Sequence, residues 1–458
     1  MRRGQVRFTV PNEQVQQEAG QRQDRDSQET VGQFSYQRVF STQLLGEVRG
    51  MARDLSAGLW SNAAATPIQA DQDRGVREMY LKGTAAAQIG QQEWKAGGEV
   101  TIGTVRERFG YQLTDASQFD PGTPAVFNFA GRRADREQAL FVQDQIRLGP
   151  WTVSAGLRWD HYQLVSDESA VSPRLGVAWA WPSADLVLRA SYDRAFQTPA
   201  VENILLSSSP AVEALNDQVI RLPVQPSLGN FYEAGVTQAL GASVRVDASY
   251  FDRRMNNFAD DDVLLNTGVS FPIAFRSAEV RGTEVKLEVP RWRAFSGSVS
   301  YAYMRGVGDL PVTGGLLLGD QVTTSLASSQ FPVSQDQRTT VRGRAGYHLT
   351  PATWVAVSTA YGSGLPFEFT GGREQAVAQY GQPIVDRVNF DTGRVRPSFS
   401  LDGSAGLVLA KGPKRSVRVQ ADVRNLTGRL NVINFAGLFS GTALSAPRSV
   451  AVRVRADY

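Results

Sequence analysis

The stretch Trp151-Thr152-Val153-Ser154-Ala155-Gly156-Leu157-Arg158-Trp159-Asp160 decides the fold. Its odd-numbered positions are mostly apolar, and its even-numbered positions are mostly small or polar. Successive side chains of a β-strand point to opposite faces of a sheet, so this alternation is typical of a strand with one apolar and one polar face. Its length of about ten residues is that of a tilted strand that crosses a lipid bilayer.

The same alternation recurs along the chain, at residues 186–193, 243–250, 341–348 and 417–424. The polar positions of these runs include arginine and aspartate as well as serine. In a wide barrel such a face lines a water-filled lumen, whereas an arginine turned to lipid near mid-membrane would cost about 2–4 kcal/mol. We therefore expect the apolar face to point to lipid and the charged face to point inward.

The connections between these runs fall into two classes. Short links and long polar stretches alternate, as in outer-membrane barrels with short periplasmic turns and long external loops. The short links lie at 149–150, 182–184, 240–242, 290–292, 350–352 and 412–413. The long stretches are 109–136, 198–226, 257–275, 308–335 and 368–395.

Tryptophan placement agrees with this arrangement. Five of the eight tryptophans lie at or near a short link: Trp94, Trp151, Trp181, Trp292 and Trp354. Tryptophan also favours strands in general. At these positions we expect a periplasmic aromatic girdle at the membrane surface.

These patterns predict an all-β fold, a transmembrane antiparallel up-and-down β-barrel with about 18 visible strands. The expected strands are 4–10, 31–40, 43–60, 76–90, 92–108, 137–148, 151–163, 170–181, 185–197, 228–240, 242–256, 276–290, 293–307, 336–349, 353–367, 396–410, 414–426 and 447–458.

The last of these strands ends in an aromatic residue that shares a face with four apolar residues. That face comprises Val450, Val452, Val454, Ala456 and Tyr458. The pattern resembles the assembly signal of outer-membrane barrels and implies the barrel assembly machinery as a partner. The alternative is an edge strand with this pattern by chance.

Composition excludes several classes of protein. The 458 residues include 20% charged and 42% hydrophobic residues, unlike a disordered chain. No run of 18 apolar residues occurs, so no transmembrane helix is expected. Cysteine is absent, which excludes disulfides and thiolate chemistry. The net charge of +3 comes without a dense basic patch, so we expect no nucleic-acid partner.

No motif points to chemistry. The two histidines, His161 and His348, have no metal-ligand spacing. The run Asp260-Asp261-Asp262 lacks the interleaved spacing of a calcium loop and is expected to be a solvated acidic loop. We therefore expect no catalytic residues, no cofactor and no metal site, and the protein is not expected to be an enzyme.

Several short motifs, in this order, resemble the TonB-dependent outer-membrane receptors. They are Ala139-Leu-Phe-Val-Gln-Asp-Gln-Ile146, Ser172-Pro-Arg-Leu-Gly176, Arg194-Ala-Phe-Gln-Thr-Pro199, Asp422-Val-Arg-Asn-Leu-Thr427 and Pro447-Arg-Ser-Val450. The resemblance extends over residues 137–458 and more loosely over 1–136. It implies a receptor barrel in the outer membrane of a Gram-negative bacterium.

The resemblance also implies parts that are not visible in this sequence. Such receptors have a signal peptide, a TonB-contact segment, a plug that fills the lumen and a barrel of about 22 strands. The sequence is therefore expected to be one domain, 1–458, a barrel truncated at the N-terminus that lacks the plug and about four strands. It is expected to be unable to couple to TonB alone, so the TonB complex is a partner only if an upstream plug exists.

Four functions remain open from the sequence, of which an outer-membrane enzyme is the weakest because no catalytic constellation is found. The first is TonB-dependent uptake of a bulky solute of the siderophore, cobalamin or oligosaccharide class, with contacts in the long loops 198–226, 257–275, 308–335 and 368–395. The second is a passive porin-like channel, complete as 18 strands. A soluble all-β binding protein such as a propeller would need repeats of about 40–50 residues, and none is found. The first two place the protein in the cell outer membrane, in contact with lipid.

Overall fold

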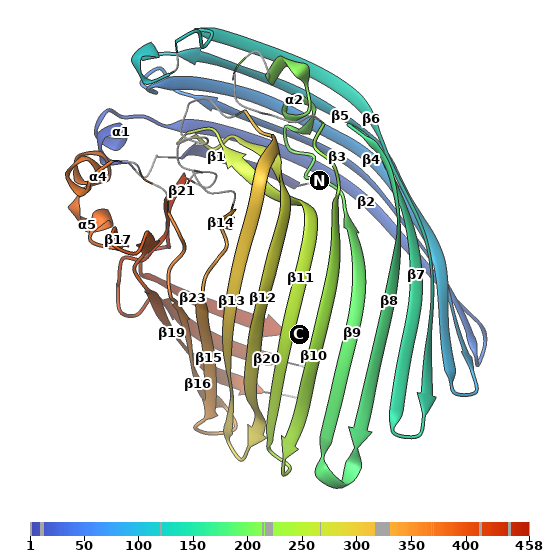
Figure 1. The fold of residues 1–458 in the computed structure, drawn as a ribbon. Helices are drawn as coiled ribbons and strands as arrows, with labels where there is room; N and C mark the ends of the chain where they lie inside the picture. The colour runs from blue at the N-terminus through green and yellow to red at the C-terminus, as the bar shows by residue number, and fades with distance from the viewer. Residues whose placement is uncertain are drawn as a thin grey trace.

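A single antiparallel sheet of nineteen strands dominates the computed structural model, and Figure 1 shows it curved around a hollow that we call the lumen. The structure describes residues 2–9, 13–119, 121–212, 215, 223–265, 267–316, 330–367, 369, 371–411, 415–437 and 441–457. Within the sheet, each long strand pairs with the next long strand along the chain, which is the expected up-and-down order.

The strands of this sheet are β1 (Arg2–Thr9), β2 (Gln23–Ser41), β3 (Leu44–Ser61), β4 (Ile68–Ile89), β5 (Gln92–Leu113), β6 (Val126–Leu148), β7 (Trp151–Gln163), β8 (Asp167–Trp181), β9 (Leu186–Gln197), β10 (Ser227–Leu240), β11 (Val244–Val263), β12 (Ser270–Trp292), β13 (Phe295–Gly314), β14 (Gln330–Pro332), β15 (Thr339–His348), β16 (Thr353–Gly362), β19 (Ser398–Lys411), β20 (Ser416–Arg424) and β23 (Ser449–Asp457). The three-residue β14 pairs only with the upper part of β13, so the other eighteen strands correspond to the eighteen expected from the sequence.

Several strands extend well beyond their expected ends. β5 and β6 continue to Leu113 and from Val126, and β11 and β12 reach into the stretch 257–275. Much of two long stretches expected to be loops, 109–136 and 257–275, is therefore strand. Apolar residues such as Phe109 and Phe271 lie on the inner face there, which reverses the alternation of the lower wall. The backbone ladder continues because each strand still has its neighbour.

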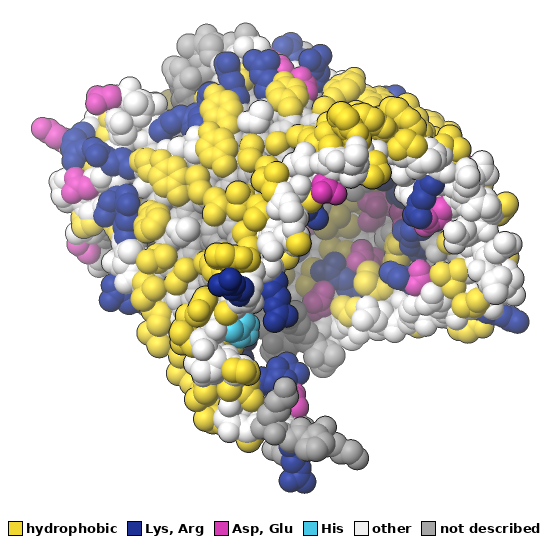
Figure 2. All heavy atoms as spheres, turned by 90° about the horizontal axis from the view of Figure 1, so that it is seen from below, with side chains coloured by type: hydrophobic (Ala, Val, Ile, Leu, Met, Phe, Trp, Pro, Cys, Tyr) yellow, Lys and Arg dark blue, Asp and Glu magenta, His cyan; other side chains and the backbone are white. Residues whose placement is uncertain are grey.

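The two faces of the sheet differ in chemistry as expected. Figure 2, viewed from the short-link end, shows hydrophobic side chains over the outer surface and Lys, Arg, Asp and Glu inside the hollow. On β12, for example, Val285 and Leu287 are exposed on the outer face, while Lys286 and Glu288 lie on the inner face. An apolar surface of this extent, in contact with no other part of the described chain, is typical of a barrel wall that faces lipid.

The short links turn tightly at the lower end of the sheet in Figure 1. Gly149 links β6 to β7 with φ +59°, and Gly241 follows β10 with φ +65°. A side chain would be strained in this left-handed region, so glycine allows the strands to reverse within a few residues.

Both edges of the sheet are open within the described residues. β1 pairs only with β2 and covers it only as far as Glu29, and β23 pairs only with β20. Residues 30–41 of β2 therefore have a strand partner on one side only. These edges carry unpaired backbone groups, which a closed barrel does not have.

Short elements occupy the connections at the upper, loop end. They are α1 (Gln14–Glu18), η1 (Ala116–Gln118), α2 (Ile204–Ser207), η3 (Pro210–Val212), α4 (Arg373–Tyr380), α5 (Gln382–Val385), and the hairpins β17 (Val388–Asn389)–β18 (Arg394–Val395) and β21 (Val432–Gly437)–β22 (Gly441–Leu444). One more, η2 (Pro182–Ala184), forms a short link. In the part of the chain that the structure describes, no helix has the length and apolar character to cross a membrane.

A charged residue substituted on the outer face tests whether that face of the sheet points to lipid. Val357 on β16 is 49% exposed on the outer face, whereas the neighbouring Ser358 lies on the inner face opposite Asp402. We expect Val357→Arg to lower the free energy of unfolding in lipid vesicles by about 2–4 kcal/mol, because arginine would enter the apolar membrane layer. The matched variant Ser358→Arg should leave it nearly unchanged. Urea titration of both variants checks this, and equal losses would contradict the assignment.

Candidate functional site in the lumen and at the loop end

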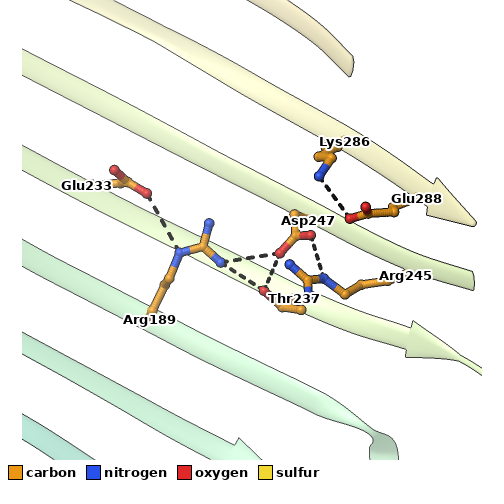
Figure 3. A network of polar contacts seen from close by, with 7 residues as sticks. All are labelled: Arg189, Glu233, Thr237, Arg245, Asp247, Lys286 and Glu288. Carbon is orange, nitrogen blue, oxygen red and sulfur yellow. Dashed lines mark hydrogen bonds and ion pairs between the residues drawn. The ribbon is translucent and has the colours of Figure 1, made fainter. Parts of the chain in front are cut away.

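An ion-pair network lines the inner wall near the short links. Figure 3 shows seven side chains from β9 to β12 that point toward one another on this face. Asp247 lies at its centre, accepting a hydrogen bond from Thr237 at 2.6 Å and from Arg245 at 2.9 Å. Arg189 donates to the Thr237 hydroxyl at 2.9 Å and lies 3.7 Å from Glu233.

The network continues to β12, where the Lys286 ammonium donates to Glu288 at 2.8 Å. A second network lies on the same face of β4, β5 and β7. There Glu99 accepts hydrogen bonds from Tyr80 at 2.9 Å, Lys82 at 2.9 Å and Arg158 at 2.6 Å. The inner wall therefore consists of charged groups that already satisfy one another.

Two hollows lie along this wall. One, of about 430 Å³, includes Lys82, Lys95, Gln143, Arg158 and Asp193 among its lining residues. The other, of about 500 Å³, is lined in part by polar side chains of β12, β15, β16 and β19, namely Glu288, Arg344, Ser358, Asp402 and Ser404. The charged and polar side chains in both linings suit a ligand with polar or charged groups.

The loop end of the lumen is filled by an apolar cluster. On one side of the sheet its members come from β3–β5, and on the other from the β11–β12 link, from β12 and from Leu316, just after β13. Leu206, Val212 and Leu215 of the long connection between β9 and β10 complete it. Phe109 and Phe271 meet edge to face with ring centroids 5.2 Å apart. The cluster, which we call the mouth cluster, therefore joins distant parts of the wall across the lumen.

Two buried polar side chains hold α2 in the mouth. Glu107 of β5, only 1% exposed, accepts hydrogen bonds from the backbone N–H groups of Leu205 and Leu206 at 3.0 Å. The Asn203 amide donates to Gln72 at 2.9 Å and to the Ser270 carbonyl at 2.7 Å. The connection 198–226, expected to be a ligand-binding loop, thus has its described α2 segment anchored inside the barrel mouth.

Sequence reasoning missed these anchors. Glu107 lies between Val105 and Phe109 on the inward face of β5. A carboxylate flanked at both alternate positions by large apolar residues was the available signal, because a buried carboxylate needs donors.

The stretch 368–395 forms a separate apolar cluster together with β21. Its aromatic members, among them Phe367, Tyr380 and Phe435, pack around α4 and α5. Its predicted role in ligand recognition stays a prediction. So do those of 257–275 and 308–335, of which 317–329 lie outside the described residues.

The first and last parts of the chain meet at this cluster. α1 lies against α4, and the carboxyl of Glu13, just before α1, is 4% exposed and is hydrogen-bonded to Gln379. Burial raises the pKa of this carboxyl, and the hydrogen bond opposes the shift. Burial and the Glu13 carboxyl also raise the pKa of Tyr380. We call this contact the clasp.

The structure places the five predicted girdle tryptophans at the short-link end of their strands. Trp94, Trp151, Trp181 and Trp292 are between 39% and 57% exposed on the outer face. Trp179 adds to them by stacking on both Trp151 and Trp181. Their role as a girdle stays a prediction.

For Trp354 the predicted girdle position is wrong. Val355 and Val357 take the outer face of β16, so the alternation turns Trp354 inward. Its ring lies over Gly406 on the inner face of β19, where a side chain would collide with it. Closeness to a short link was a weaker guide than the strand's own alternation.

The predicted assembly signal lies on the edge strand β23. Val450, Val452 and Val454 share one face, each 67–69% exposed, and Ala456 follows on that face. Tyr458 lies outside the described residues. The role of these residues in assembly stays a prediction.

The remaining candidates do not form a site together. His161 lies on the outer face beside Trp159, whereas His348 lies far along the sheet on β15. The aspartates 260–262 belong to strand β11 instead of a solvated loop, because Asp260 binds Ser334 and Asp262 accepts from the Leu316 N–H. Among the described residues, no group of three or more His, Asp or Glu could hold a metal ion.

Comparison with models of protein families identifies the family to which this chain belongs. Residues 5–426 match a family model described as TonB dependent receptor-like, beta-barrel. The chain belongs to this family. No curated protein matches it.

Solved structures agree on the fold of this TonB-dependent receptor barrel. It is similar to the copper transporter OprC (13% identity, TM-score 0.65), the ferric citrate transporter FecA (14%, 0.64) and the siderophore receptor PiuA from Acinetobacter baumannii (13%, 0.60). These similarities cover 95–96% of this chain but 66%, 62% and 64% of those chains. The barrel thus spans less than two thirds of their length. The family and these neighbours are receptors and transporters.

The anchor of α2 can be removed with one substitution. In Glu107→Gln, an amide N–H₂ replaces one accepting oxygen and faces the backbone donors of α2. We expect hydrogen exchange of the Leu205 and Leu206 amides to accelerate at least tenfold, because a hydrogen bond to a charged group contributes about 1.5–3 kcal/mol. The exposed outer-face variant Asp54→Asn is the control. Unchanged exchange in Glu107→Gln would show that packing alone holds α2.

The clasp should depend on pH through Glu13. Since burial raises the pKa of this carboxyl in the folded state, the clasp is most stable below the ordinary glutamate pKa of 4.5 and weakens as pH rises toward the folded-state value. Spin labels on α1 and α4 should show a broader distance distribution at pH 7 than at pH 4. Glu13→Gln should remove this difference. A wild-type distribution that is the same at both pH values would contradict the role of Glu13.

Proposed function

We propose that this barrel is the wall of an outer-membrane receptor for TonB-dependent uptake of a bulky solute of the siderophore, cobalamin or oligosaccharide class. The match of residues 5–426 to the receptor family is the observation that carries the proposal. The apolar outer face and the charged lumen support a location in the cell outer membrane, in contact with its lipid.

The inner wall supports uptake of a solute larger than ions. Its two hollows, of about 430 and 500 Å³, are polar, and the mouth cluster obstructs the loop end. Passage of a bulky solute therefore requires α2 and its neighbours to move. In TonB-dependent uptake, energy for such a movement comes from the TonB complex through a plug.

We further propose that additional strands and a plug complete the receptor. The open edges at β1, β2 and β23 support this, because backbone groups without partners are costly in lipid. The greater length of the similar receptors supports it as well. On this proposal the 1–458 chain is a fragment that cannot couple to TonB alone.

Genomic sequence tests the proposal directly. The DNA before the codon for Met1 should encode, in frame, a signal peptide, a TonB-contact segment and a plug. The protein expressed with that segment should be retained by an immobilised TonB periplasmic domain, and the 1–458 chain should not. An in-frame stop with no plug-coding sequence upstream would reject the receptor proposal.

A passive porin-like channel is the second candidate, favoured by the charged lumen. The two differ in conductance. A porin of 18 strands should give stable, ohmic steps in planar bilayers, because its lumen is water-filled. For the receptor barrel we expect no such steps, since the mouth cluster closes the loop end. Stable steps in the wild-type chain would favour the porin.

A further inference from the structure

One hollow of the inner wall differs from the ion-pair networks around it. It is the hollow of about 430 Å³, which we call the basic hollow, and its volume lies within the range of small-molecule sites, about 300–1,000 Å³. Lys95 in its lining follows Trp94 near the start of β5, so the hollow lies toward the short-link end of the lumen. The proposed function places this end at the periplasmic side of the membrane.

The charged groups in the lining of the basic hollow are mostly cations. They are Lys82, Lys95, Arg158, Arg174 and the carboxylate Asp193. Lys82 and Arg158 already bind the carboxylate of Glu99, at 2.9 and 2.6 Å. The Arg174 guanidinium lies 3.8 Å from Asp193, beyond hydrogen-bond distance, and Lys95 has no carboxylate within ion-pair distance among the described residues. Lys95 and Arg174 can therefore still bind an anion.

The uncharged polar side chains of the basic hollow also lack partners. Across the part of the chain that the structure describes, Gln143, Gln145, Ser154 and Ser191 make no side-chain hydrogen bond, and the Lys95 ammonium makes none either. In the network of Figure 3, by contrast, every side chain drawn has a partner. Ammonium, amide and hydroxyl groups can all donate hydrogen bonds. Donors that converge on one hollow without acceptors favour a ligand that is rich in acceptor oxygens.

The pairing of the strands explains the shape of the hollow. Lys95, Gln143, Gly156 and Arg174 are direct neighbours in one row across β5, β6, β7 and β8. Gly156 has no side chain, so it leaves a gap between the long side chains on its two sides. Lys95 and Arg174 are three strand spacings apart, roughly 14 Å between their backbones. Their charged groups can therefore contact two different anionic groups of one ligand.

We propose that the basic hollow binds a compact solute that carries two or more carboxylate or phosphate groups. Lys95 and Arg174 bind the anionic groups, since ammonium and guanidinium form charge-assisted hydrogen bonds to carboxylate and phosphate oxygens. Gln143 and Ser154 donate to further oxygens of the solute. The inference rests on the proposed function and narrows the class of solute that this barrel takes up to polyanions.

The position of the basic hollow makes it a site on the way out of the lumen. The mouth cluster closes the loop end, so the solute reaches the hollow only after α2 and its neighbours have moved. The Arg174 side chain is 58% exposed, and contacts with hydrated cations are weak. Weak binding suits a transit site, because a transported solute has to leave again.

Isothermal titration calorimetry of the detergent-solubilised 1–458 chain tests the site, with citrate and inorganic pyrophosphate as separate probes. Loss of one contact with a partly hydrated cation lowers affinity by roughly three- to tenfold. The variant K95Q/R174Q should therefore bind the tighter probe at least tenfold more weakly than the wild type.

The matched control is K286Q/R245Q, which removes the same two residue types from the same face of the sheet. Both of these cations already bind carboxylates, Lys286 at 2.8 Å from Glu288 and Arg245 at 2.9 Å from Asp247. The control should stay within twofold of the wild type. Equal affinity in the two double variants would overturn the basic hollow as the anion site.

The shape of the hollow has its own test, which leaves every charge in place. The Ser154 side chain lies over Gly176, with its hydroxyl oxygen 2.6 Å from the position that a Cβ on Gly176 would take. In Ser154→Leu a larger, apolar side chain therefore occupies the hollow. We expect at least a threefold loss of affinity for the tighter probe, with the same thermal unfolding midpoint as the wild type. Unchanged affinity would overturn the placement of the ligand in this hollow.

The choice of probes tests the class of ligand. Acetate carries one anionic group and should bind at least tenfold more weakly than citrate. Acetate that binds as tightly as citrate would overturn the requirement for two anionic groups. Tighter binding of citrate than of pyrophosphate assigns the solute to the polycarboxylates, and the reverse order assigns it to the phosphates.

Failure of this inference is distinguishable from failure of the proposed function. A wild-type chain that binds neither citrate nor pyrophosphate overturns the anion site alone, because retention of the longer protein by TonB still supports the receptor. An in-frame stop before Met1, found together with binding of citrate, rejects TonB-dependent uptake and supports the anion site in the lumen.

Discussion

Inside a lipid bilayer, backbone N–H and C=O groups can bind only to one another, and the rest of this structure depends on that constraint. Each long strand satisfies it through ladders to its neighbours on both sides, over as many as 22 register positions between β4 and β5. Because the ladder fixes the pleat, it also fixes which side chains face lipid and which face the lumen. The exceptions are β1, β2 and β23, whose outer edges have no ladder within the described residues.

Since lipid takes the outer face, the chain cannot build a core between layers as soluble proteins do. Its apolar clusters lie at the loop end, where connections fold back over the lumen. Below them the wall is charged, and groups such as Asp247 and Glu99 have several partners each. A wall satisfied in this way is stable without a ligand, so it can offer polar hollows to a passing solute.

Alternation in the sequence predicted the fold well because the two faces of each strand meet different environments, lipid on the outside and the lumen on the inside. All eighteen expected strands exist, and their lower ends are placed closely. The upper ends were predicted too short, as at β4 and β6, because apolar residues such as Ile68 and Phe129 face the mouth cluster there while the outer face is polar, which reverses the contrast seen lower on the strand. Trp354 was misplaced because a residue's position along a strand says nothing of its face.

The contacts at the loop end could not be predicted from the sequence, for a different reason. The bond between Glu107 and α2 joins residues that are far apart in sequence, so the local pattern around Glu107 indicates its burial but not its partner. The helix α4 was missed because its sequence has only a weak amphipathic pattern. Its buried residues are Ala376 and Tyr380. The mouth cluster draws on Phe271 and Leu316, which lie within stretches that read as polar loops.

The clasp has a consequence for biogenesis. Its two sides, around Glu13 and Gln379, lie 366 positions apart in the sequence, so the cell synthesises one long before the other. Contacts of such long range are costly in loop entropy and form late. The edges of the early strands therefore stay unpaired until the later segments are made, and in that interval they are prone to aggregation.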